Sequence, residues 1–249
     1  MTNTTPIGVF DSGIGGLSVL REIRKQLPSA DIVYLADQAF APYGERSLDN
    51  VRTRVSSIVT ALIDAGCGPI VMACNTASAA ALHHVRRLHG HVVFVGMEPA
   101  VKPAAETTGA GVIGVLATPA TFQSELYASV VDRHGEGVEV IAQPAPGLVE
   151  LVEARRPNAA RPLLEMYLQP MIDAGIDRLV LGCTHYPFLM DQIRALLPDH
   201  VEVIDPAPAV ARQVARVAVG SGSAGERHLT TRPSELTTVV TDVIEFADV

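Results

Sequence analysis

The sequence predicts an α/β protein of two pseudo-symmetric domains, each a mainly parallel sheet flanked by helices, with an active site in the cleft between them. Three observations lead to this prediction. Short apolar runs alternate with longer helix-like segments, the second half of the chain repeats features of the first, and the 48 % apolar content comes mostly from small residues, with no tryptophan. Such alternation favours parallel sheets covered on both faces, and small side chains suit helices packed on them.

The predicted elements follow one another in a regular order. Apolar runs predict strands at 7–10, 31–36, 70–73, 92–95, 112–116, 138–141, 179–182 and 201–204. Between the first four of these strands, helical periodicity predicts helices at 17–27, 48–65 and 77–88. A glycine- and serine-rich loop is predicted at 220–225, and β-branched residues leave 235–246 ambiguous between strand and helix.

The chain contains an internal repeat. The segment L-I-D-A-G at 62–66 resembles M-I-D-A-G at 171–175, an offset of 109 residues. The same offset superposes Cys74 on Cys183, and each lies at the end of a predicted strand. The third cysteine, Cys67, falls at the start of a strand, so we interpret it as a small core residue.

The charge balance excludes two classes of partner. The net charge is −8, and basic residues are scattered singly or in short helical groups such as Arg52 and Arg54. Nucleic acids and anionic membranes require clustered Lys and Arg, so we expect neither as a partner. No apolar stretch reaches the roughly 20 residues of a bilayer span, and no secretory signal is visible. We therefore expect a cytoplasmic protein.

The sequence argues against a metal or an organic cofactor. Three cysteines without a C-x-x-C motif suggest neither a disulfide framework nor a zinc site. Pyridoxal phosphate chemistry requires a Schiff-base lysine, but Lys25 lies on a polar helix face and Lys102 lies between two prolines. We expect that the protein uses no cofactor and no metal.

Polar residues directly follow four of the predicted strands. They are Asp11 and Ser12, then Cys74, Asn75 and Thr76, then Thr118, then Cys183, Thr184 and His185. Asp37 lies near a fifth strand end. Ligands of parallel sheets bind beyond the carboxyl ends of the strands. The glycine-rich turn at 13–18 lacks phosphate-loop spacing, and Asp11, unless it only caps the next helix, would repel phosphate and attract an ammonium group. An amino acid therefore fits better than a nucleotide.

Cys74 and Cys183 each lie between a strand end and a predicted helix N-terminus. There the helix dipole and free N–H groups are expected to lower the pKa of the thiol below about 8.5. One thiolate can remove a proton from one face of a carbon while the opposite thiol delivers a proton to the other face, which inverts a stereocentre. His185 can exchange a proton with Cys183; alternatively, it is a helix-cap or core-edge histidine.

Four motifs together resemble the signatures of the bacterial glutamate racemase family. They are D-S-G-I-G-G-L-S (11–18), P-Y-G (42–44), A-C-N-T-A-S-A (73–79) and G-C-T-H-Y-P (182–187). The resemblance implies a cofactor-independent enzyme of two α/β domains that interconverts L- and D-glutamate and supplies D-glutamate for peptidoglycan. It also implies that the C-terminal part returns to the first domain, which gives domains at 1–98 plus 207–249 and at 99–206.

The resemblance also assigns residue roles by motif. The implied catalytic residues are Cys74, Cys183, Asp11, His185 and Glu153. Glu153 lies in L-V-E-L-V-E, where Glu150 gives an alternative register. The implied glutamate-binding residues are Asp11, Ser12, Tyr43, Gly44, Asn75, Thr76, Thr118, Thr184 and His185.

Three alternatives remain open on the sequence alone. A related two-cysteine racemase would act on aspartate or another amino acid, although the N–H groups of P-Y-G and the Tyr43 hydroxyl favour the side-chain carboxylate of glutamate. A non-catalytic amino-acid-binding protein would have no reason to keep both thiols. A redox protein would pair Cys74 with Cys183, with the sulfurs about 2 Å apart. We also expect a homodimer.

Overall fold

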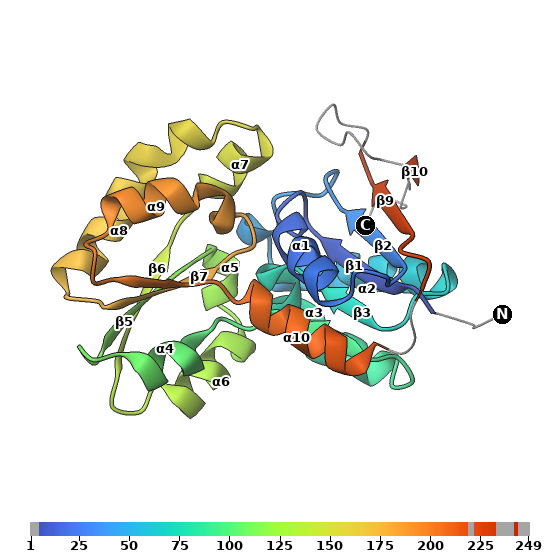
Figure 1. The fold of residues 1–249 in the computed structure, drawn as a ribbon, viewed down its shortest axis with the longest axis horizontal. Helices are drawn as coiled ribbons and strands as arrows, with labels where there is room; N and C mark the ends of the chain where they lie inside the picture. The colour runs from blue at the N-terminus through green and yellow to red at the C-terminus, as the bar shows by residue number, and fades with distance from the viewer. Residues whose placement is uncertain (1–4, 219–221, 233–241, 244–249) are drawn as a thin grey trace.

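A computed structural model of the chain describes residues 5–218, 222–232 and 242–243. Two parallel β-sheets, each covered by helices, form the body of the protein (Figure 1). The strands are β1 (Ile7–Asp11), β2 (Ile32–Ala36), β3 (Ile70–Met72), β4 (Phe94–Gly96), β5 (Val112–Ala117), β6 (Glu139–Pro144), β7 (Arg178–Gly182), β8 (Glu202–Ile204), β9 (Glu226–Thr230) and β10 (Asp242–Val243). The α-helices are α1 (Leu17–Gln26), α2 (Leu48–Asp64), α3 (Asn75–Leu88), α4 (Val101–Thr107), α5 (Pro119–Phe122), α6 (Glu125–His134), α7 (Leu148–Glu153), α8 (Arg161–Asp173), α9 (Met190–Leu196) and α10 (Ala207–Val217). The 3₁₀ helices are η1 (Tyr43–Glu45), η2 (Pro157–Ala160) and η3 (Tyr186–Leu189).

The first sheet has the strand order β10-β9-β2-β1-β3-β4 and is parallel throughout. Helices α2 and α3 cover one face, where Ile58 and Leu82 belong to the same buried cluster as Phe10 of β1. Helices α1 and α10 cover the other face with Ile23 and Val210. Because β9 and α10 come late in the chain, the chain returns to this sheet after it has formed the second one (Figure 1).

The second sheet has the strand order β6-β5-β7-β8 and is also parallel. Helices α7, α8 and α9 pack on one face, where Leu168 and Ile193 share a buried cluster with Leu181. Helices α4 and α6 pack on the other face with Ala104 and Val130. We call this sheet and its helices the second half, and the first sheet with α1, α2, α3 and α10 the first half.

The internal repeat predicted from the sequence is confirmed by the topology. The order β2-β1-β3-β4 in the first sheet matches the order β6-β5-β7-β8 in the second. Strands β1 and β3 therefore correspond to β5 and β7, and all four are central strands. The polar residues noted at four strand ends, from Asp11 to His185, lie at or just after the ends of these four strands, so each half contributes two strand ends.

All eight predicted strands are present, as β1 to β8. Both faces of these strands are covered, so their apolar runs were a strong signal. The ambiguous segment 235–246 lies outside the described residues except for β10, and the predicted loop at 220–225 is described only from residue 222. The domain boundaries at 98 and 207 stay a prediction.

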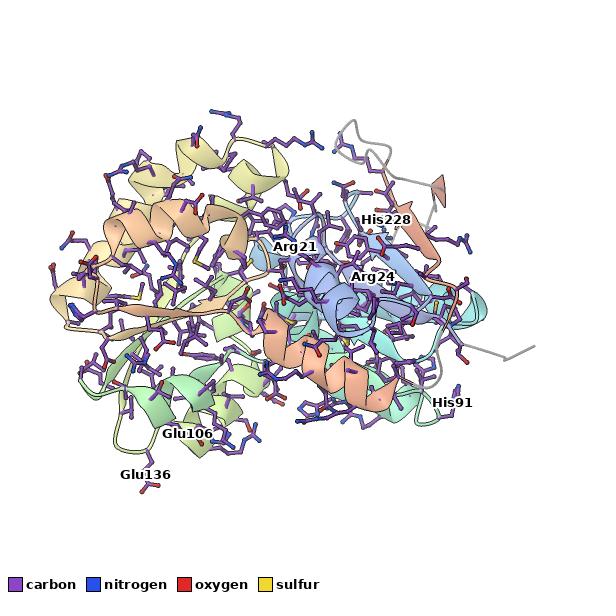
Figure 2. All side chains as sticks on the ribbon, viewed as in Figure 1. Arg21, Arg24, His91, Glu106, Glu136 and His228 are labelled. Carbon is purple, nitrogen blue, oxygen red and sulfur yellow. The ribbon has the colours of Figure 1, made fainter. Side chains whose placement is uncertain are left out.

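Charged side chains are spread over the outside of both halves. Figure 2 shows Arg21 and Arg24 of α1 beside His228 of β9, whereas Glu106 and Glu136 project from the second half. Within the described part of the chain, no helix combines the length and the apolar character needed to cross a membrane.

Candidate active site

The first thiol lies just beyond a central strand of the first sheet. Strand β3 ends at Met72, and Cys74 is the N-cap of α3, where its sulfur accepts the N–H of Ala77 at 3.5 Å. The hydroxyl of Ser12 lies 3.9 Å from the same sulfur, and Cys74 is buried. The predicted position between a strand end and a helix N-terminus is confirmed.

The predicted lowering of the pKa of Cys74 is wrong. Burial raises the pKa of this thiol far above its usual range, and the negative charge of Asp11 raises it further. Hydrogen bonds from the Ala77 N–H and with the Ser12 hydroxyl lower the pKa by less. A buried thiolate loses its water shell, and a helix N-terminus compensates for only part of that loss. Cys74 is therefore protonated and can donate a proton.

Asp11 links the first thiol to the second half. Its Oδ2 accepts the N–H of Gly13 at 2.9 Å, and its Oδ1 accepts the hydroxyl of Thr184 at 3.1 Å. Burial raises the pKa of Asp11, although the positive charge of His185 and the N–H groups of Gly13 and Gly16 lower it. A bound cation such as an ammonium group would favour the ionised carboxylate at this position.

The second thiol, Cys183, directly follows β7. The helix N-terminus that follows Cys183 is that of the 3₁₀ helix η3, which begins at Tyr186, whereas α9 begins only at Met190. The N–H of Tyr186 bonds to the carbonyl of Cys183 at 3.2 Å, which closes a tight turn instead of a first α-helical turn. The sulfur of Cys183 lies 3.8 Å from Nδ1 of His185.

His185 is held between Cys183 and a carboxylate. Its Nε2 donates to Oε1 of Glu153 at 2.6 Å, so Glu153 rather than Glu150 is the carboxylate next to the imidazole. His185 is fully enclosed, with a side chain that is 2 % exposed. His185 is the N-cap residue of η3, but its side chain makes no capping hydrogen bond and instead contacts Cys183 and Glu153.

The His185–Glu153 pair is an ion pair at neutral pH. Burial lowers the pKa of His185, but hydrogen bonds with Cys183 and Glu153 outweigh it and raise the pKa well above its usual range. Burial also raises the pKa of Glu153, but the His185 hydrogen bond and charge, together with the Ile14 N–H and the Gln38 amide, lower it overall. A protonated imidazole therefore faces the sulfur of Cys183.

Asn75 directly follows Cys74, and its side-chain amide is buried without a hydrogen-bond partner from the described residues. Among the described residues neither its Nδ2 nor its Oδ1 has a hydrogen-bond partner, although buried amides are normally paired. Next to it, the Thr76 hydroxyl bonds to the Thr118 hydroxyl of the second half at 2.9 Å. The orphan amide indicates a place where a polar ligand binds.

The predicted role of the Tyr43 hydroxyl requires a correction. This hydroxyl is buried and donates to Oδ2 of Asp37 at 2.6 Å, and Arg54 donates to both oxygens of the same carboxylate at 2.6 and 2.8 Å. Tyr43 therefore anchors the P-Y-G turn to the buried Asp37, and its hydroxyl proton is not directed to a ligand. Gly44 reaches the site with its backbone and packs closely on Thr118.

Sequence reasoning missed three contributors to this region. Arg54 lies in the middle of α2, where nothing in the sequence distinguishes it from a surface arginine. Gln38 follows the end of β2 and contacts Glu153, and Ser18 donates to the carbonyl of Thr184 at 3.1 Å. Polar residues at strand ends were the available signal for Gln38, since Asp37 beside it was noted on that ground.

Two cavities bear on the position of the site. The one that Gly44 and Thr118 line measures only about 10 Å³. A cavity of about 540 Å³ lies elsewhere, along β4, α4 and α10, and contains none of the predicted site residues. Neither of these two cavities is lined by Cys74, Cys183 or Asn75. We place the active site at the strand ends that carry both thiols and the orphan amide. Within the described residues no cluster of three His, Cys, Asp or Glu side chains could hold a metal ion.

Comparisons with known proteins agree on one family. The Asp/Glu/hydantoin racemase family model matches residues 7–214. Glutamate racemase of Roseiflexus sp. is 52 % identical over 85 % of this chain and 79 % of its own length, and glutamate racemase of Ectopseudomonas mendocina is 50 % identical over 85 % and 81 %.

A solved structure shares the fold along the whole chain. The crystal structure of Escherichia coli glutamate racemase, in complex with L-glutamate and an activator, is 31 % identical and has a TM-score of 0.85 over 97 % of this chain and 98 % of its own. The sequence match and the shared fold lead to one conclusion: this chain belongs to the Asp/Glu/hydantoin racemase family and, within it, to the glutamate racemases.

Proposed function

We propose that the protein interconverts L- and D-glutamate without a cofactor, by two-base proton transfer at Cα between Cys74 and Cys183. The observation that carries this proposal is a pair of thiols at equivalent strand ends of the two halves, each with a different proton-handling neighbour. All three cysteines are free thiols, so Cys74 and Cys183 are not joined as a redox pair would be.

The surroundings of the thiols support opposite resting roles. Cys74, kept protonated by burial and by Asp11, delivers a proton to one face of Cα. Cys183 removes the proton from the other face, and His185 exchanges a proton with its sulfur. In the reverse direction the two thiols exchange roles, as inversion of a stereocentre requires. Glu153 keeps the imidazole charged and oriented.

The polar groups around the thiols suit a zwitterionic amino acid. We propose that Asp11 binds the ammonium group of glutamate. The carboxylates are bound by neutral donors, one of which, the Asn75 amide, has no hydrogen-bond partner in the described part of the chain. The other proposed contacts are Ser12, the backbone of Tyr43 and Gly44, Thr76, Thr118, Thr184 and His185. The E. coli relative, which was solved with L-glutamate, supports this choice of substrate.

The physiological setting follows from the reaction. We propose that the D-glutamate is used for peptidoglycan synthesis in the cytoplasm. The expected homodimer stays a prediction, which sedimentation of the purified protein tests directly.

The experiment that tests the reaction compares three cysteine variants. We expect Cys74→Ser and Cys183→Ser each to lower kcat for racemisation by about 10²–10⁴-fold, as expected for loss of one acid/base group. Cys67→Ser is the matched control, because Cys67 is also buried but packs against Gly8, away from the strand ends. Each protein is incubated with D- or L-glutamate in deuterated water, without added cofactor, and optical rotation and deuterium at Cα are followed.

The outcomes separate the proposal from its alternatives. Deuterium exchange that survives in one single variant identifies the face that the remaining thiol serves. Racemisation of aspartate but not glutamate would keep the mechanism and overturn the substrate. A wild-type protein that exchanges no amino-acid proton would overturn the racemase proposal and leave an amino-acid-binding protein.

A further inference from the structure

Hydrogen bonds join the two halves close to the thiols, and Glu153 of the second half makes two of them. Its Oε1 accepts the backbone N–H of Ile14 at 2.7 Å, and its Oε2 accepts the side-chain amide of Gln38 at 3.3 Å. Both donors belong to the first half. The same Oε1 also accepts Nε2 of His185 at 2.6 Å, so one oxygen atom serves both the contact between the halves and the imidazole next to Cys183.

The glycine-rich turn of the first half is the surface on which Glu153 rests. A methyl group at Gly13 would overlap the carboxylate of Glu153, and a methyl group at Gly15 would overlap the imidazole of His185. Glycine at these two positions therefore allows the carboxylate to approach the backbone closely enough to bond to Ile14. The turn, which does not have phosphate-loop spacing, has a different use here.

A substrate can enter only when these contacts open. Cys74, Asn75 and Cys183 are only 5, 3 and 7 % exposed. A substrate that contacts both thiols therefore requires the two halves to separate for binding and release and to rejoin for the reaction. The bonds from Ile14 and Gln38 to Glu153 therefore break and re-form in each catalytic cycle.

We propose that Gln38 is a positioning residue: with the N–H of Ile14 it holds the Glu153 carboxylate as the cleft closes, so that His185 is aligned with Cys183 only in the closed enzyme. Thr230 of β9 supports this role, because its hydroxyl donates to Oε1 of Gln38 at 3.1 Å and fixes which end of the amide faces Glu153. The catalytic part of this inference rests on the proposed function, whereas the contact itself is tested without any activity.

The first test measures the contact directly by hydrogen exchange. In Gln38→Met the amide of Ile14 is expected to exchange about five- to tenfold faster, the usual effect of losing one supporting hydrogen bond. Gln192→Met is the matched control, since Gln192 also donates one bond, to the carbonyl of Pro157 at 2.8 Å, but lies on α9 away from the thiols. Exchange at Ile14 is read by mass spectrometry with single-residue fragmentation.

The second test uses activity and its pH dependence. In Gln38→Glu two carboxyl groups face each other at neutral pH and repel, whereas at lower pH they share a proton and the contact is restored. The other titratable groups that interact with Glu153 are His185, Asp11 and Tyr34, and all three are unchanged in this variant. We therefore expect kcat relative to wild type to fall about tenfold at pH 8 and to recover as the pH is lowered toward 5.

These results decide the inference in either direction. Unchanged Ile14 exchange in Gln38→Met, or equal acceleration in Gln192→Met, would overturn it, as would a Gln38→Glu activity ratio that does not vary with pH. If Gln38→Met does not fold, Gly13→Ala tests the same contact, because the added methyl group would displace the Glu153 carboxylate from Ile14. This variant should accelerate Ile14 exchange in the same way. A wild-type protein that fails to racemise glutamate overturns the proposed function, and the exchange result still stands.

Discussion

The two thiols occupy equivalent positions of a repeated fold but lie in unlike surroundings. Cys74 is the N-cap of the α-helix α3 and lies next to Asp11, whose pKa is raised by burial. Cys183 precedes a 3₁₀ turn, next to a protonated imidazole held by Glu153, whose pKa is lowered. The repeat therefore places the two sulfurs at equivalent positions, whereas their neighbours differ: Asp11 lies near Cys74, and His185 lies near Cys183. Such asymmetry suits a reaction in which one thiol gives a proton while the other takes one.

The halves also differ in how they hold their acidic residues. In the first half Asp37 is paired internally with Arg54, and both side chains are almost completely buried. In the second half Glu153 is partly exposed and takes its partners from both halves. An internal pair stabilises one half at all times, whereas the Glu153 contacts depend on closure.

The largest expected effect comes from breaking the ion pair between Asp37 and Arg54. Arg54→Met leaves Asp37 buried without its cation and is expected to lower the free energy of unfolding by about 3–5 kcal/mol. Urea denaturation followed by circular dichroism measures the change. The double variant Asp37→Asn with Arg54→Met should recover most of the loss. A loss below about 1 kcal/mol would show that the pair contributes no more than a surface salt bridge.

The next effect separates binding from stability on helix α3. Because the Asn75 amide has no partner among the described residues, Asn75→Ala should leave the melting temperature nearly unchanged. The KM for glutamate should rise about 5- to 100-fold, equivalent to about 1–3 kcal/mol. Ser78→Ala on the same helix is the control: its hydroxyl bonds to Met72 and Met97 at 3.1 and 2.9 Å. This control should lose stability and keep its KM; the reverse pattern would contradict the assignment.

The smallest expected effects are changes in the free energy of unfolding, and they have opposite signs for Glu153 in the second half and Asp11 in the first. The pKa of folded Glu153 lies below its usual 4.5, so the ionised carboxylate stabilises the fold above that pH, and this contribution is lost as pH falls through the folded pKa. Glu153→Gln should therefore lower the free energy of unfolding at pH 7 by about 1–3 kcal/mol. The difference from wild type should shrink when the pH is lowered below 4.5.

Asp11 should behave in the opposite way. The pKa of folded Asp11 lies above its usual 3.8, so the wild type loses stability as pH rises above that value. Asp11→Asn removes this cost, so its free energy of unfolding at pH 7 should equal that of the wild type or exceed it by up to about 1 kcal/mol. The variant should lose activity. Denaturation curves at several pH values measure both variants, and a shared sign would contradict the asymmetry of the two sites.

The strands and the repeat were predictable because they depend on local apolar patterns. The positions of Cys74, Asp11 and Cys183 followed from them, since residues after central parallel strands meet at one edge. The pKa of Cys74 was not predictable, because the helix dipole is visible in the sequence but the burial that opposes it is a tertiary property. The hydroxyl of Tyr43 was assigned wrongly because it bonds to Asp37, which is buried and paired with Arg54 of another element, and this tertiary arrangement is not visible in the sequence.

The pairing of Glu153 with Gln38 shows the same limit at longer range. The two residues lie 115 positions apart in the chain. Their contact depends on how the second half meets the glycine-rich turn, and apolar periodicity carries no information about that. The motif around Glu153 indicated a carboxylate near the site, but only the fold distinguishes it from Glu150.

The pairing of β9 with β2 has a consequence for biosynthesis. The first sheet needs β9 at its β2 edge, and Thr231 just after β9 donates to Asp37 at 2.8 Å. All strands of the second sheet leave the ribosome before β9 does, although the first sheet begins earlier in the chain. The half that is synthesised first is therefore completed last. Until β9 has been synthesised, the β2 edge has unpaired backbone groups, as any exposed strand does.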